Sequence, residues 1–266
     1  MKLYFAGSTK DDFEPIEVSD NKNILLSFFY YKGAMKKYID NNYSRFDNLL
    51  LDSGAFSFYN SGKEICLNKY VESLKESPFK KYFNLDVIGD AEGSFLNYKK
   101  MLELNTNPIP VFHADTNLKY LQKYLDSTDF ISVGGLVGNK NIERNLDVVF
   151  SEIDKGGYDV SVHGLGLTSV PILKKYPFYS VDSTSYVSII KFARVQQWCG
   201  NEFKTFNTLD FFSKKGAKFK DGSTSGYRYF LLHWQQQQYI SMINYVNEYR
   251  NNKTHVDDYL TQLTLF

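Results

Sequence analysis

Three aspartates and two histidines directly follow short apolar runs in this sequence: Asp52, Asp86, Asp182, His113 and His163. Carboxylates and imidazoles are the side chains that attack as nucleophiles, transfer protons or bind metal ions. One such residue at the end of an apolar run is ordinary turn chemistry. Five of them in the same setting are more than turns require, which favours a functional site.

Each carboxylate also has a purely structural interpretation. Asp52 could form a turn with its own backbone, and Asp182 could cap a helix. Either Asp86 or Asp90 could cap the helix that follows them. The two histidines lack the spacing of a helical metal site, which favours hydrogen-bonding roles in a pocket over metal ligation.

Eight apolar runs that end in small or polar residues predict the elements that position these side chains. Near-continuous apolar runs are typical of strands buried on both faces of a parallel sheet. The runs are Leu3–Ala6, Ile24–Tyr30, Leu49–Leu51, Tyr82–Leu85, Ile109–Phe112, Phe130–Val133, Val160–Val162 and Tyr179–Val181.

Helical patterns separate most of these runs. Leu67, Tyr70, Val71 and Leu74 have the i, i+3, i+4, i+7 spacing of an amphipathic helix. Eight strands alternating with helices predict an α/β fold of the (β/α)8 TIM-barrel type, with a doubly wound open sheet as the alternative. Residues 11–22 show no helical pattern, so the first unit is expected to be irregular. Function in such barrels gathers at the carboxyl ends of the strands, where the five residues lie.

The C-terminal part of the chain is expected to extend the barrel. Val187–Trp198 is predicted to be a helix, residues 214–226 a loop rich in Lys, Gly and Ser, and Tyr227–Arg250 a long helix packed on the barrel. Residues 1–200 are therefore assigned to the barrel, and residues 201–266 to a C-terminal loop and helix of the same domain.

Composition narrows the classes of function. Lys and Arg number 31 against 30 Asp and Glu, a net charge of +1 that excludes a strongly polycationic binder. Cys66 and Cys199 are the two cysteines, too few for a disulfide framework or a cysteine-rich zinc site. The sequence shows no secretion signal or membrane span, so we expect a cytoplasmic protein without membrane contact.

Six short motifs occur in the order known from one enzyme family. They are Leu51–Phe56, Asn84–Asp90, Pro110–His113, Ser132–Leu136, His163–Gly166 and Tyr179–Ser185. With these motifs the sequence resembles the tRNA-guanine transglycosylase superfamily, most closely its DpdA-type 7-deazaguanine DNA transglycosylases of phages and bacteria. That resemblance implies a TIM barrel that replaces guanine with a 7-deazaguanine derivative. It also implies the cytoplasm of the host as location if the chain is phage-encoded.

The resemblance also implies roles for individual residues. Asp182 matches the aspartate nucleophile, Asp52 the acid/base that binds the base, and Phe56 the aromatic that stacks on it. Asp86 matches the acidic residue that reads the purine edge. The remaining substrate-binding set is Ser53, Gly54, His113, Gly134, Gly135, His163 and Gly164. His113 occupies a position where the tRNA enzymes commonly carry Gln.

Two departures from the tRNA enzymes favour DNA as the substrate. Those enzymes usually carry a cysteine-rich zinc motif after the last strand, where this chain has only Cys199, and their C-terminal segment is longer. We expect DNA and a free 7-deazaguanine base as substrates, no cofactor and no metal. A basic run is predicted to bind the nucleic-acid backbone: Lys214, Lys215, Lys218, Lys220 and Arg228.

Three alternatives remain open at this stage. One is tRNA as the substrate, and another is a hydrolase acting on nucleosides or bases with the same barrel. The third is a non-catalytic binding subunit. The pair of carboxylates disfavours it, because a protein that only binds an anionic nucleic acid has no need of two carboxylates near it. The basic run could equally be a solvated loop. A requirement for a partner protein is not encoded in these motifs.

Overall fold

Eight parallel strands form a closed barrel in the computed structural model, which describes residues 1–214 and 224–263 and the side chains of 1–214 and 227–253. The strands are β1 (Lys2–Gly7), β2 (Asn23–Ser27), β3 (Asn48–Asp52), β4 (Lys81–Tyr82), β5 (Val111–His113), β6 (Phe130–Gly134), β7 (Ser161–Gly164) and β8 (Ser180–Ser183). They are hydrogen-bonded in the order β4-β3-β2-β1-β8-β7-β6-β5. A parallel bridge between Phe83 and Ile109 joins the two edges. The (β/α)8 prediction is therefore confirmed.

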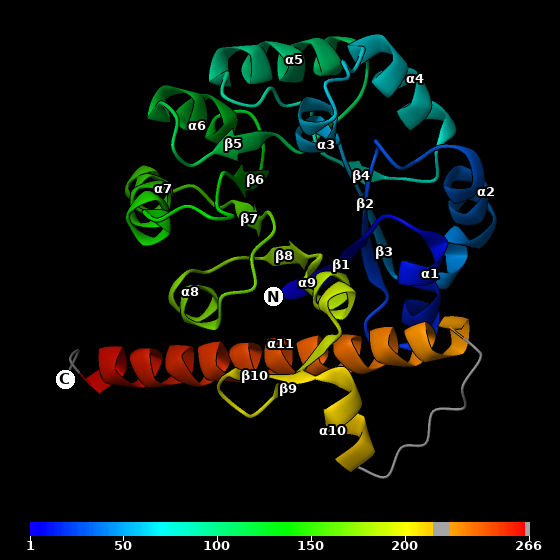
Figure 1. The fold of residues 1–266 in the computed structure, drawn as a ribbon. Helices are drawn as coiled ribbons and strands as arrows, with labels where there is room; N and C mark the ends of the chain where they lie inside the picture. The colour runs from blue at the N-terminus through cyan, green and yellow to red at the C-terminus, as the bar shows by residue number, and fades with distance from the viewer. Residues whose placement is uncertain (215–223, 264–266) are drawn as a thin grey trace.

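Helices surround the strands in Figure 1. They are α2 (Gly33–Asn42), α4 (Leu67–Glu76), α5 (Ala91–Glu103), α6 (Leu118–Leu125), α7 (Ile142–Gly156) and α8 (Val170–Lys175), with the short α3 (Ala55–Asn60) after β3. The first connection holds only α1 (Lys10–Phe13) and the 3-10 turn η1 (Glu14–Val18). The opening unit is irregular, as the missing helical pattern predicted.

The long helix α11 (Thr224–Leu263) closes the ring of helices, running along the side of the barrel between α8 and η1. Near its start, Arg228 donates to Asp12 of α1 at 2.6 Å. Farther along, Asn247 bonds to the amino group and the carbonyl of Met1. The eighth helix of the ring therefore comes from beyond residue 200, where the sequence placed the end of the barrel.

The segment predicted as one helix over Val187–Trp198 is different, and that prediction is wrong. It holds α9 (Ser185–Ser188), the turn η3 (Ile189–Phe192) and the strand β9 (Arg194–Trp198). β9 pairs antiparallel with β10 (Phe203–Asn207), before helix α10 (Thr208–Lys214). The backbone N–H groups of Gln196 and Trp198 donate to Gln235 and Gln238 of α11 at 2.7 and 2.9 Å. These side chains occupy the outer edge of the strand, so a partner distant in sequence decides its conformation.

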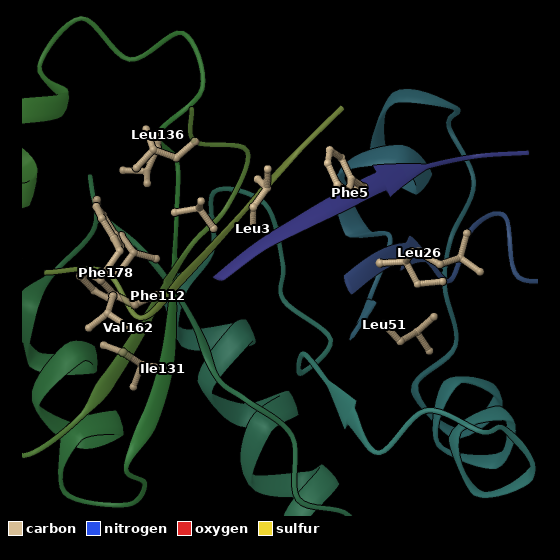
Figure 2. Close-up of a cluster of buried hydrophobic side chains, with 14 of the residues drawn as sticks. Leu3, Phe5, Leu26, Leu51, Phe112, Ile131, Leu136, Val162 and Phe178 are labelled. Carbon is tan, nitrogen blue, oxygen red and sulfur yellow. The ribbon is translucent and has the colours of Figure 1, made fainter. Parts of the chain in front are cut away.

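Alternation along the strands separates two apolar layers. Leu3 and Phe5 of β1 and Leu26 of β2 belong to the layer between strands and helices, part of which Figure 2 shows. Tyr4 of β1 and Leu50 of β3 belong to a second cluster that fills the barrel. The helices described in the structure include none long and apolar enough to cross a membrane.

Candidate functional site

The inward-facing positions of the strands turn from apolar to polar at their carboxyl ends. Asp52 lies two residues after Leu50 on β3, and His113 lies two residues after Val111 on β5, so both side chains point into the barrel. Asp182 is aligned with the inward-facing Tyr4 of the neighbouring strand β1. This polar layer is the mouth at which barrel enzymes carry their active sites.

Asp86 is held at the mouth by two neighbours. Its Oδ1 accepts a hydrogen bond from the Ser53 hydroxyl at 2.7 Å, and its Oδ2 lies 2.9 Å from Nε2 of His113. Asp90 caps helix α5, accepting from the N–H of Gly93 at 2.9 Å. Since Asp90 is the cap of this helix, Asp86 does not have that structural role and can contribute to the pocket.

His113 is the more open member of this pair. Its side chain is 17 % exposed, against 8 % for Asp86. Burial alone would lower the pKa of His113. The hydrogen bond to Asp86 and the charges of Asp86 and Asp115 outweigh it, so its pKa lies above the ordinary value for histidine. Asp86 therefore stabilises the protonated form of His113.

Asp52 has an environment that disfavours its charge. Its Oδ2 accepts a hydrogen bond from the Gly54 N–H at 2.9 Å, which is the turn that the structural interpretation predicted. Burial, then the charge of Asp86 and to a smaller extent that of Asp182, raise the pKa of Asp52 to about 7. A carboxyl group with this pKa can both donate and accept a proton near neutral pH.

Asp182 is oriented by hydrogen bonds across the opposite side of the mouth. Its Oδ1 accepts from the Gly166 N–H at 2.9 Å and lies 3.2 Å from Nε2 of His163. Nδ1 of the fully buried His163 is 2.8 Å from the Ser180 hydroxyl. A proton on Nε2 satisfies both contacts, since the ring then donates to Asp182 and accepts from Ser180. The described residues provide no hydrogen bond to Oδ2, which leaves this oxygen for a substrate.

Asp182 is not a helix cap, because the N-cap of α9 is Thr184. The adjacent Ser183 hydroxyl does not hold the Asp182 carboxylate, because it accepts from the N–H of Ser185 at 3.0 Å. The partners of Asp182 come from the β7 strand and the loop after it. Sequence reasoning missed Ser180, although its spacing of two from Asp182 places both on the inner face of β8. No local signal identified the Gly166 amide.

The predicted aromatic residue and three of the predicted glycines have different surroundings. Phe56 on α3 is 67 % exposed and therefore free to stack on a ligand. Gly54 has a φ of +78°, and a Cβ there would lie 2.8 Å from the Ser27 hydroxyl. Gly134 faces inward, since a Cβ there would lie 3.6 Å from the His113 ring. A Cβ at Gly164 would instead lie 3.0 Å from the ring of Phe178 in the outer layer, which indicates a packing role.

Gly135 continues the turn after β6 with a φ of +70°. A Cβ there would lie 3.2 Å from an oxygen of Asp115, the residue whose charge acts on His113. Its left-handed backbone favours glycine at this point of the rim.

The predicted backbone-binding run lies partly outside the described residues, which omit Lys215, Lys218 and Lys220. Lys214 is exposed at the end of α10. Arg228 has a different role from the predicted one, because its guanidinium pairs with Asp12, of which 1 % is exposed. A buried carboxylate without such a partner is strongly destabilising, so Arg228 belongs to the fold.

Both cysteines lie in connecting segments. Cys66 precedes helix α4 and Cys199 lies after β9, and both are exposed free thiols. Within residues 1–214 and 227–253 there is no cluster of three or more His, Cys, Asp or Glu side chains able to hold a metal ion.

A separate cavity of about 410 Å³ lies beside the mouth. Hydroxyl groups and aromatic rings contribute most of its lining, which consists of Thr168, Ser169, Ser185, Ser188, Ile189, Phe192, Gln196, Phe203 and Tyr239. None of the predicted site residues is among them. The cavity and the carboxylate site are therefore formed by different residues.

Comparisons with known proteins support the fold alone. No protein-family model matches the chain, and no curated protein matches it significantly. Among solved structures, "a putative fructose-1,6-biphosphate aldolase from Coccidioides immitis" superposes with a TM-score of 0.57 at 11% sequence identity. The match covers 93% of this chain and 90% of that one. At this identity the likeness extends to the barrel architecture and leaves the chemistry to the residues at the mouth.

Proposed function

We propose that this chain is a base-exchange transglycosylase that replaces guanine in DNA with a 7-deazaguanine derivative through a covalent aspartyl–glycosyl intermediate. The observation that supports this function best is the unequal environment of Asp52 and Asp182. One carboxyl group has a pKa near 7, and the other is oriented by an amide and an imidazole with one oxygen left open. Acid/base and nucleophilic roles need this kind of difference between two carboxyl groups.

In the first half of the reaction, Oδ2 of Asp182 attacks C1′ of the target nucleotide. The C1′–N9 bond breaks, and its electron pair leaves with the guanine. Protonated Asp52 donates a proton to the departing base, so guanine leaves neutral and Asp52 becomes a carboxylate. The sugar remains bound to Asp182 as an ester.

In the second half, the incoming 7-deazaguanine occupies the place of the departed guanine. Its N9 loses a proton to the Asp52 carboxylate and attacks C1′, and the bond to Asp182 breaks. Both aspartates return to their starting states. Two displacements at C1′ retain its configuration.

The target base must leave the base stack to reach the mouth. The exposed ring of Phe56 offers a face on which a flipped base can stack. His113, paired with Asp86, offers a hydrogen-bond donor beside the inward-facing Gly134. DNA is preferred over tRNA because the chain lacks the cysteine-rich motif of the tRNA enzymes.

The direct test measures incorporation of radiolabelled guanine into a DNA oligonucleotide, a tRNA transcript and a control without polymer. We expect label in DNA, and loss of that label for Asp182→Asn. Label in tRNA alone would replace DNA by tRNA as the substrate. Release of base from free nucleosides with no incorporation would favour the hydrolase.

A further inference from the structure

Exposed aromatic rings gather beside Asp52 on two neighbouring segments. Tyr59 of α3 is 68 % exposed, and Tyr30, in the segment between β2 and α2, is 36 % exposed. Tyr59 lies three residues after the exposed Phe56, so both are on the same face of the helix. Rings this exposed contribute little to the core, and grouped exposed rings often mark a binding surface.

The two segments are joined into one surface. The Phe28 N–H donates to the Asp52 carbonyl at 2.8 Å, which fixes the β2–α2 segment to the end of β3. The ring of Phe58, on the other face of α3, packs edge-on against Phe29 with centroids 4.9 Å apart. Phe29 in turn contacts Tyr30 at 5.1 Å. Tyr30 and Tyr59 are therefore presented by supported elements at the rim of the mouth.

Two lysines add positive charge to this surface. Nζ of Lys32 lies 4.5 Å from the centroid of the Phe29 ring, and Nζ of Lys63 lies 5.8 Å from it. In the described part of the chain, neither lysine forms a salt bridge. The whole chain has a net charge of only +1, so attraction for a polyanion must come from local groups such as these.

We infer that Tyr30, Lys32, Tyr59 and Lys63, here called the α3 platform, bind unpaired nucleotides adjacent to the target guanosine. Aromatic rings stack on any base, and lysines neutralise the phosphates between bases, which is how proteins hold single strands. The assignment of this strand to the target guanosine rests on the proposed function. Binding of a single strand to the platform does not.

The test measures the binding of a fluorescent oligothymidylate of about twelve nucleotides, a length within the usual range for such sites. This probe has no guanine, so its affinity is independent of base exchange. We expect Tyr59→Ala and Tyr30→Ala each to weaken binding by about fivefold or more, the usual effect of losing one stacked base. Tyr59→Phe keeps the ring and should bind like the parent protein.

The lysines are tested through salt. Lys32→Ala and Lys63→Ala should each reduce the slope of log affinity against log salt by about 0.7, the value for one phosphate contact on a single strand. Matched controls lie on the opposite face of the barrel, before the strands begin. They are Tyr43→Ala, a half-exposed tyrosine ahead of β3, and Lys80→Ala, an exposed lysine ahead of β4.

Unchanged oligothymidylate affinity in the Tyr59→Ala and Tyr30→Ala variants would overturn the inference. So would equal weakening by the two control variants, or tighter binding of a duplex of the same length that Tyr59→Ala leaves intact. Circular dichroism and thermal unfolding show whether a variant is folded. The two proposals can also fail separately. If the parent protein binds oligothymidylate but shows no base exchange, and the platform variants lose this binding, the result supports the platform and contradicts the proposed function.

Discussion

Two histidine–aspartate pairs stand on opposite sides of the barrel mouth and are built in opposite ways. In the Asp86–His113 pair both carboxylate oxygens are occupied, and the partly exposed imidazole faces the mouth. In the Asp182–His163 pair the imidazole is fully buried between Asp182 and Ser180, and one carboxylate oxygen is open. The member with an unused polar atom differs between the pairs. The comparison suggests His113 on one side, and Asp182 on the other, as the group that meets the substrate.

The largest effect is expected from Asp182→Asn. The amide cannot form an ester with C1′, so base exchange should fall on the order of 10⁴-fold or more while the protein stays folded. Denaturing electrophoresis should show a covalent protein–DNA adduct for the parent protein and none for the variant. An adduct formed by Asp182→Asn would move the nucleophile to the other side of the mouth, with Asp52 as the candidate.

Asp52→Asn should reduce exchange by about 10²- to 10⁴-fold, the usual contribution of a general acid or base. The parent protein should also cleave the glycosidic bond more slowly as pH rises through about 7, because Asp52 then loses the proton that it donates. Single-turnover cleavage measured from pH 5 to 9 checks this. A variant that keeps the inflection near 7 would show that another group is responsible.

His113→Ala should raise KM about tenfold with a smaller change in kcat, since a charged hydrogen bond is worth about 1.5–3 kcal/mol.

Asp86→Asn tests the same pair by changing the hydrogen-bond partner of His113. Without the carboxylate, the pKa of His113 should fall, because the hydrogen bond and charge that raise it are removed. Histidine proton resonances of the four histidines report this by NMR titration, with His113→Ala giving the assignment. If Asp86→Asn raises KM and His113→Ala does not, then Asp86 reads the base itself.

The smallest expected effect is on stability. The folded pKa of Asp52 is raised, so folding favours its neutral form, and the stability that it contributes falls as pH rises from about 4 to about 7. The amide that replaces this carboxyl group in the Asp52→Asn variant has no charge to bury. The unfolding free energy of the variant relative to the parent should therefore increase between pH 5 and pH 8. Urea unfolding at both pH values measures it, with the exposed Asp47→Asn as control; a relative free energy that does not increase would contradict the raised pKa.

The sequence alone located the eight barrel strands and most of the residues at their ends. The exception is Asp86, which lies four residues beyond the end of β4 at Tyr82, whereas the predicted run continued to Leu85. Strands buried on both faces leave near-continuous apolar runs, and the polar residue that ends a run is visible without any structure. Parity along a strand places Asp52 on the same face as Leu50, and His113 on the same face as Val111. Only the structure shows that this shared face is the inner one. In both cases the order of apolar and polar residues along the chain reflects which positions are buried.

Tertiary structure alone decided which of these residues became partners. Asp86 meets His113 because β4 and β5 join when the barrel closes, and Asp182 meets the Gly166 amide because the β7 loop folds over β8. The strand β9 replaces a predicted helix because glutamines of α11, about forty residues away, occupy its edge. When the barrel closes, it brings distant segments together, and a buried polar group pairs with a group on the segment that comes to lie beside it. No local sequence pattern identifies that distant partner.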